Sequence, residues 1–141
     1  MNGGSTVEIK GQYKKAGEPT NSLELSLVKS ARDSLSIWQY TSLDEMYSRL
    51  KNDIESIDRW EFQATQNGEM VAMLIVDRYD NEPHTGHDIL YTKFAFSTNT
   101  GALAQGYRWM KRLAKALGIK FIVTTRQTGS RKIEYNYHEV K

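Results

Sequence analysis

The sequence of 141 residues contains no cysteine. Disulfide bonds, and thiolates acting as nucleophiles or metal ligands, are therefore excluded. The chain also lacks any apolar run that approaches the length of a membrane span. Its first residues, MNGGSTVEIKGQYKK, have no hydrophobic core of a signal peptide. We therefore expect no insertion into a membrane and no secretion by a signal peptide.

A strong charge of either sign is missing as well. The formal net charge is +2 at pH 7, so the charge of the whole molecule gives no argument for a nucleic-acid partner. Only the distribution of charge is uneven, because Lys and Arg concentrate toward the C-terminal third. The hydrophobic content of 39% and the charged content of 26% are typical of a globular protein. At this length we expect about one domain, with a core that needs no disulfide.

Apolar residues are scarce at the N-terminal end. Residues 1–22 are rich in glycine and polar side chains and leave little to bury. We therefore expect residues 1–34 to form an arm that is flexible or docks on another protein subunit, and residues 35–141 to form the domain. The segments TVEIK and LELSLV would each form a strand or short helix if another surface covered them.

A regular pattern begins at the apolar stretch 35–40, which predicts a short strand. Ser42 and Glu45 then form a capping box, the signature of a helix N-terminus. Apolar residues at helical spacing predict that this helix runs to about Ser56.

A hairpin is predicted next. Asn67-Gly68 is the strongest hairpin turn of the chain, and it joins predicted strands over 59–66 and 69–79. The second of these strands contains VAMLIV, a nearly continuous apolar run of the kind that is buried on both faces of a sheet.

The C-terminal half continues with a strand over 88–96, a helix and two further strands, 120–126 and 132–140. The helix is indicated by apolar residues at steps of three and four, and Gly118 follows it at the position of a C-cap glycine. The order of strand, helix, three strands, helix and two strands predicts an α+β fold with a mixed, mainly antiparallel sheet and helices packed on it.

Residues 96–125 combine a strand end, a small-residue turn, an amphipathic helix and a strand. With the preceding elements, this stretch resembles the core of the GNAT (Gcn5-related N-acetyltransferase) superfamily over about residues 35–140. In that family the turn carries Arg or Gln, a first glycine and a second Gly or Ala, and the helix carries Ala and Gly near its end. Ala114, Gly101 and Gly118 match these positions, whereas Thr98 and Leu103 depart from them.

The resemblance implies acetyl-CoA as cofactor, with its pyrophosphate held by backbone N–H groups at the N-terminus of this helix. The absence of an acid in the first turn favours an anion there. Because Thr98 replaces the family's Arg or Gln, we expect weak binding. The candidate cofactor residues are Phe96, Thr98, Asn99, Thr100, Gly101, Ala102 and Ala104.

Catalysis by acetyl transfer needs a base, donors to the oxyanion and an acid for the thiolate. Glu61, Asp88 and His87 flank the central strands and are the candidate bases. The oxyanion donor would be a backbone N–H within 94–96. Glu61 also fits the solvated face of a strand, because it alternates with aromatic residues, and Asp88 fits a strand entry. In the family a further helix after the fifth strand often carries a tyrosine acid.

This sequence has no room for that further helix, since the chain turns straight back as a hairpin. Tyr135 and Tyr137 lie nearby, and Tyr135 is a further catalytic candidate. His84, His87 and Asp88 invite a metal site, but no cysteine and only one other histidine are available, so a solvated loop is the better interpretation.

A row of basic residues follows the outer side of the second helix, and more follow in the last strands. They fit CoA phosphates, nucleic acid or an acidic protein surface, but a solvated face that complements the helix dipole is the stronger interpretation. The residues are Arg108, Lys111, Arg112, Lys115, Lys120, Arg126, Arg131 and Lys132.

Three functions therefore stay open. The first is an acyl-CoA-dependent N-acetyltransferase of full or reduced activity. The second is a non-enzymatic structural or interaction protein on a GNAT-like fold, similar to proteins of tailed-phage virions. The third is a small phage counter-defence factor that binds nucleic acid or protein. The expected location is cytoplasmic or in a virion, and CoA binding is the observation that separates these functions best.

Overall fold

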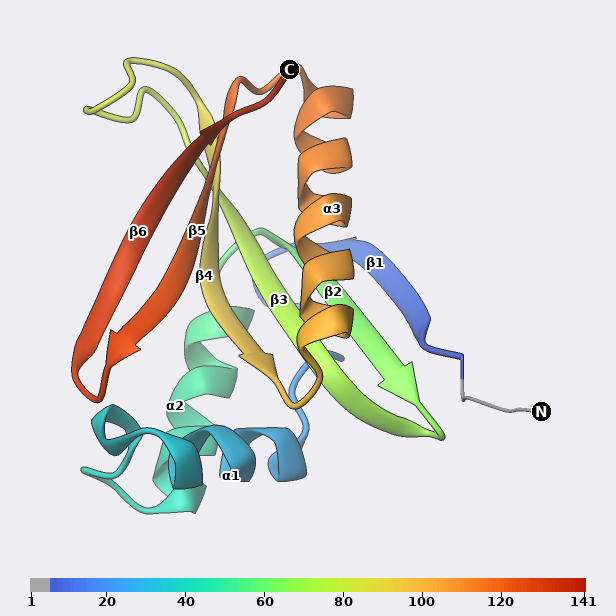
Figure 1. Ribbon diagram of the computed structural model, residues 1–141, viewed down its shortest axis with the longest axis vertical. Helices are drawn as coiled ribbons and strands as arrows, with labels where there is room; N and C mark the ends of the chain where they lie inside the picture. Colours follow the sequence, from blue (N-terminus) through green and yellow to red (C-terminus); the bar gives the residue numbers. More distant parts are fainter. Residues whose placement is uncertain (1–5) are drawn as a thin grey trace.

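The computed structural model describes residues 6–141, which form one six-stranded sheet with helices on both faces (Figure 1). Neighbouring strands lie side by side in the order of the sequence, and every pair is antiparallel except β4 and β5, which are parallel. The predicted α+β fold with a mixed, mainly antiparallel sheet is therefore confirmed. The strands are β1 (Glu8–Lys14), β2 (Arg59–Gln66), β3 (Glu69–Tyr79), β4 (Ile89–Ser97), β5 (Phe121–Gly129) and β6 (Lys132–Glu139).

The helices divide between the two faces of the sheet. Helix α3 (Thr100–Leu117) covers one face, and α1 (Leu25–Ser34) and α2 (Leu43–Glu55) cover the other (Figure 1). Because strand side chains alternate, Leu74 and Val76 of β3 enter the core under α3, while Met73 and Ile75 enter the core under α1 and α2. The burial of VAMLIV between helices on both faces is therefore confirmed.

Local signals in the sequence determine the ends of these elements. Ser42 accepts a hydrogen bond from the Glu45 amide at 3.2 Å and so caps α2. Asn67 and Gly68 both have positive φ, 54° and 79°, as the predicted hairpin turn requires. Gly118 ends α3 with φ 71° in the left-handed region, the conformation that favours glycine.

The predicted strand over residues 35–40 is wrong. A single 3-10 turn, η1 (Ser36–Trp38), occupies this stretch. Its apolar residues are explained by packing, since the rings of Trp38 and Phe96 lie edge to face with centroids 5.5 Å apart. The Ile37 amide donates to the Ser130 carbonyl, so η1 contacts the β5–β6 turn.

Residues 8–34 also differ from the expected arm. β1 pairs with β2 in the sheet, and α1 buries Leu27 and Val28 in the core. Gly11 of β1 lies so close to the ring of Trp109 in α3 that a Cβ there would overlap it. Both elements therefore pack against the rest of the sheet and core. Residues 1–5 of the expected arm lie outside the described residues.

None of the helices within residues 6–141 is both long and apolar enough to cross a bilayer.

Candidate active site

A cleft opens where β4 and β5 separate. The two strands pair only at Ile89–Phe121, Leu90–Ile122 and Tyr91–Val123 and then diverge, as Figure 1 shows. The cleft beyond the last pair has a volume of about 1110 Å³ and is lined by β4, β5, β6, α1, η1 and α3. It therefore extends from the α3 face of the sheet to the α1 face, and its volume is sufficient for a cofactor and a small second ligand.

A β-bulge lies on β4 beside the cleft. Ile75 of β3 pairs with Phe94, but the next residue, Val76, pairs with Thr92. Lys93 is therefore the extra residue of the bulge and has no partner across β3. After Tyr91, β4 no longer pairs with β5. Among the described residues, the edge of β4 that faces the cleft therefore has no strand partner from here onward, although the other edge still pairs with β3.

The N-terminus of α3 lies at the cleft, but part of its hydrogen-bonding capacity is used internally. The Thr98 amide donates to the Val71 carbonyl, and the Ala102 amide donates to the Asn99 side chain at 3.1 Å. The Asn99 amide itself donates to the Ser97 hydroxyl. Within residues 6–141, the Thr100 and Gly101 amides have no hydrogen-bond partner.

The free amides at the helix end are therefore fewer than the sequence analysis expects. Among the seven candidate cofactor residues, the cleft lining includes Phe96, Thr98, Asn99 and Thr100, but not Gly101, Ala102 or Ala104. Leu103, which stands at the family's second Gly/Ala position, both lines the cleft and packs on the core under α3.

Besides Lys93 of β4, two arginines from different elements line the cleft. Arg108 comes from the third turn of α3 and Arg126 from β5. The sequence analysis groups both with the basic surface, and only the tertiary structure separates them from Arg112 and Lys115, which do not line the cleft. No acidic residue stands in the first turn of α3. This side of the cleft is therefore suited to an anion.

The face opposite α3 contributes several apolar side chains to the cleft. Ile122 lies in the core under α3 and pairs with His138, so alternation along β6 directs Tyr135 and Ile133 to the opposite face. There they line the cleft together with Leu35 and Trp38, which follow α1.

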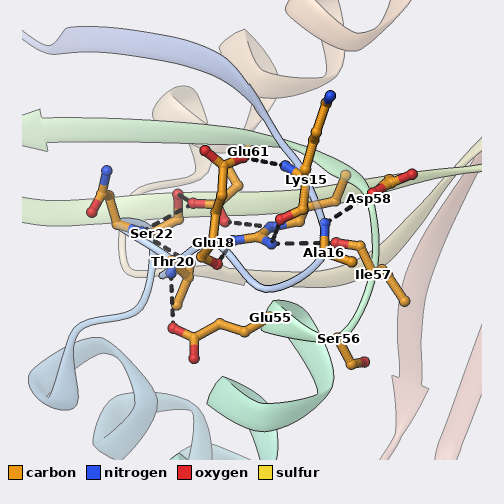
Figure 2. Close-up of polar contacts among 12 residues, drawn as sticks. Lys15, Ala16, Glu18, Thr20, Ser22, Glu55, Ser56, Ile57, Asp58 and Glu61 are labelled. Atoms are coloured by element: carbon orange, nitrogen blue, oxygen red, sulfur yellow. Dashed lines mark hydrogen bonds and ion pairs between the residues drawn. The ribbon is translucent and has the colours of Figure 1, made fainter.

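Glu61, a candidate base, does not line the cleft. Its side chain is completely buried, and its carboxylate accepts hydrogen bonds from Arg59 at 2.9 Å, the Ser22 hydroxyl at 2.7 Å and the Asn21 amide at 3.2 Å (Figure 2). The interpretation as a solvated strand face is therefore wrong. The connection between β1 and α1, with Asn21 and Ser22, contacts Glu61 on this side, which a periodicity argument applied to β2 alone does not reveal.

Arg59 is buried next to Glu61 and holds the connection between β1 and α1. It donates to the carbonyl oxygens of Lys15 at 3.1 Å and Glu18 at 2.8 Å. Figure 2 shows two further contacts to this connection: the Thr20 amide donates to Glu55, and the Ala16 amide donates to Asp58. The Arg59–Glu61 pair therefore has a structural explanation, as a buried ion pair whose hydrogen-bonding groups are satisfied.

Asp88, the second candidate, lies outside the cleft lining at the start of β4. Its carboxylate accepts hydrogen bonds from the Asn81 amide at 3.0 Å and from Arg78 at 2.8 Å, and these contacts lower its pKa. A carboxylate that is stabilised in its charged form is a weaker base. His87 lies in the same β3–β4 loop and does not line the cleft either.

The β3–β4 loop contains a small polar cluster of its own. Glu82 accepts hydrogen bonds from His84, Thr85 and Tyr137. Burial raises the pKa of Glu82, but these hydrogen bonds lower it more, to about 2. The cluster attaches the loop to β6. Among the described residues, no group of three or more His, Cys, Asp or Glu side chains is arranged to hold a metal ion.

Tyr135 is the one catalytic candidate that lines the cleft, and it is 66% exposed. His138 also lines the cleft and shares a hydrogen bond of 3.1 Å with the Thr124 hydroxyl. The sequence analysis considers His138 only as a possible metal ligand. The pairing of β6 with β5 brings His138 to the cleft, and that pairing is not visible in the sequence alone.

The predicted hairpin in place of a further helix is confirmed, because β5 leads directly into β6. The side chains on the α3 face of this hairpin include Thr124, Arg126, Asn136 and His138, and all of them line the cleft. A helix that packed on them would have to bury polar groups. Their polarity therefore fits a surface that stays open.

No protein-family model and no curated protein matches this sequence. The fold does match solved structures. The aminoglycoside N-acetyltransferase AAC(6')-Iy, solved in complex with CoA, matches with a TM-score of 0.56 and 12% identity over 91% of this chain and 82% of that one. An N-acetyltransferase from Staphylococcus aureus Mu50 matches with a TM-score of 0.51 and 14% identity over 85% of this chain and 70% of that one. The protein therefore shares the fold of these N-acetyltransferases.

Proposed function

We propose that the protein binds acyl-CoA in the cleft between β4 and β5 and transfers the acyl group to an amine. The observation that carries this proposal is the separation of the two parallel strands next to a helix N-terminus that has free amides, in a cleft that two arginines also line. The neighbour that was solved with CoA has the same fold, which supports the choice of ligand.

The phosphates of the ligand would bind on the α3 side of the cleft. The Thr100 and Gly101 amides would donate to the pyrophosphate, aided by the positive end of the helix dipole. Arg108 and Arg126 would add charged donors. Thr98 is too short to replace the family's Arg or Gln. The Ala102 amide already donates its hydrogen bond to the Asn99 side chain. We therefore expect binding to be weak.

The reaction would take place where the strands begin to diverge. A backbone N–H within 94–96 would donate to the thioester carbonyl oxygen and stabilise the developing negative charge. His138 would accept the proton of the attacking amine as the new C–N bond forms. Tyr135 would donate a proton to the thiolate that leaves as the C–S bond breaks.

A calorimetric titration of CoA into the full chain tests this proposal. Gly101→Val adds a β-branched side chain at the helix N-terminus, and an added Cβ meets only Asn99 Oδ1 at 3.4 Å, so the fold should tolerate it. Ala116→Val is the matched control, because this residue is exposed near the other end of α3. We expect saturable binding that Gly101→Val abolishes and Ala116→Val preserves. No binding at millimolar CoA by the folded protein would rule the proposal out.

The second candidate is a non-catalytic role on the same fold, as in a virion or interaction protein. Two observations favour it: no helix follows β5, and none of the described residues that line the cleft is Asp or Glu. CoA binding without transfer to any amine would support this candidate over the enzyme.

A further inference from the structure

The charges around the cleft are of one sign. Lys93, Arg108 and Arg126 line it, and the described lining residues include no carboxylate. An aminoglycoside carries several ammonium groups, and each one that is desolvated needs a carboxylate or comparable acceptor. A polycation would instead meet positive potential here. The cleft is therefore poorly suited to the substrate class named for the neighbour AAC(6')-Iy.

Several aromatic side chains line the cleft opposite α3. Phe94 and Phe96 of β4 are stacked with centroids 6.5 Å apart, and the ring of Trp38 meets Phe96 edge to face. Tyr135 of β6 lines the same cleft. Aromatic walls favour an apolar or aromatic ligand through burial of area and ring contacts.

A second hollow of about 670 Å³ lies between η1 and α2 and shares Trp38 and Phe94 with the cleft. Tyr40 and Met46 are among its other lining residues. Its single acidic lining residue within the described chain, Asp53, lies 3.5 Å from Lys93 and is thus already close to a positive charge. An apolar ligand body therefore has room to extend from the cleft past Trp38 without meeting a free carboxylate.

We propose that the acceptor of this cleft is an amine on an aromatic or branched aliphatic body that carries at most one positive charge, and that Trp38 and Phe94 form its binding wall. This inference rests on the proposed function, since it names the acceptor of the same site. Trp38 is the specificity-determining residue that the inference assigns.

The test is a chemical-shift titration of the full-length chain with two amines, each with and without CoA. The probes are 2-phenylethylamine, which has one ammonium group and one phenyl ring, and kanamycin, an aminoglycoside. The variants are Trp38→Leu and the matched control Trp60→Leu. The wild-type Trp60 ring packs on Tyr13 of β1, the strand at one edge of the sheet. A thermal melt of each variant confirms that it folds.

We expect 2-phenylethylamine to bind about tenfold more tightly than kanamycin. Trp38→Leu should lower the affinity for 2-phenylethylamine about tenfold. Trp60→Leu should leave this affinity unchanged. Gln127→Glu, which adds a carboxylate to the lining with almost no change of shape, should raise the affinity for kanamycin about fivefold. Wild-type binding of kanamycin as tight as that of 2-phenylethylamine overturns the inference, as does an equal effect of both tryptophan variants.

The outcomes keep this inference separate from the proposed function. If CoA binds but 2-phenylethylamine does not bind in either condition, the acceptor class is wrong and the cofactor proposal stands. If the amine binds as expected and CoA does not, the cleft is an amine site and the acetyltransferase proposal fails.

Discussion

Arg126 and Arg108 differ from the other basic residues in position, not in type. Both line the cleft, whereas Arg112 on the outer side of α3 does not. A hydrogen bond to a charged group contributes about 1.5–3 kcal/mol, and exposure to solvent reduces the ionic part. We therefore predict that Arg126→Ala weakens CoA binding about tenfold at low salt, measured by calorimetry.

The control for this prediction is Arg112→Ala, which removes the same charge outside the cleft and should change the affinity less than about twofold. Added salt should reduce the difference between the two variants, because salt screens exposed charges. Equal losses in both variants would mean that only the overall charge of the protein matters.

His138 is the residue that we assign as base in the proposed reaction. His138→Gln should lower kcat/KM by about 10²–10⁴, because the attacking amine loses its proton acceptor. The measurement is a steady-state assay with CoA product detection. His87→Gln removes an imidazole that does not line the cleft and should preserve kcat/KM. An unchanged kcat/KM in His138→Gln would show that the base lies elsewhere.

At the scale of elements, the Arg59–Glu61 pair connects β2 with the segment that leads from β1 to α1. Removal of one member leaves a buried charge unpaired, which costs about 3–5 kcal/mol. We predict this loss of unfolding free energy for Glu61→Leu, measured by urea denaturation. The double variant Arg59→Met with Glu61→Leu should be less destabilised, because no unpaired charge remains.

This pair of variants also tests the candidate role of Glu61 in catalysis. If Glu61→Leu kept full stability but lost acyl transfer, the carboxylate would act on the reaction and the structural explanation would fail.

The N-terminal elements give a second prediction at this scale. β1 pairs with β2 along seven residues, and α1 buries Leu27 and Val28. We therefore expect limited proteolysis of the isolated chain to leave residues 8–34 attached to the domain, detected by mass spectrometry of the protected fragment. Early cleavage between residues 15 and 30 would show that this segment is ordered only on a partner, as an arm would be.

For the whole molecule, acid stability depends on carboxylates whose pKa the fold lowers. Glu82 is the largest case, because its pKa falls from 4.5 to about 2 through hydrogen bonds from His84, Thr85 and Tyr137 that exceed the opposing effect of burial. A lowered pKa stabilises the fold at every pH above the value in the unfolded chain, and this contribution is lost as the pH falls. The relevant window runs from about 4.5 to about 2.

We predict that the melting temperature falls as the pH is lowered through this window, and that Glu82→Gln makes the dependence shallower. Circular dichroism melts at several pH values provide the measurement. Glu134→Gln on exposed β6 is the control and should leave the slope unchanged. A slope that Glu82→Gln does not alter would mean that other carboxylates determine acid unfolding.

Features that depend on nearby residues could be predicted from the sequence. The capping hydroxyl of Ser42, the turn at Asn67-Gly68 and the left-handed Gly118 depend on backbone conformations within one or two turns of chain. The apolar patterns of the strands and of α3 likewise predict burial. Every second side chain of a strand, and one in every three to four of a helix, faces the core. These signals were sufficient for the fold class and for the position of the turn that precedes α3.

Features that depend on distant neighbours were decided by the tertiary structure alone. Glu61 was interpreted as solvated because Asn21, in the connection that contacts it, stands 40 residues earlier in the chain. Arg126 and His138 are ordinary surface residues in the sequence, and the divergence of β4 from β5 makes them line a cleft. Residues 35–40 have the apolar composition of a strand but pack as a 3-10 turn, since no strand lies beside them to accept their hydrogen bonds. Local conformation is determined by interactions between residues that are close in the sequence. A site is determined by which distant surfaces the packing brings together.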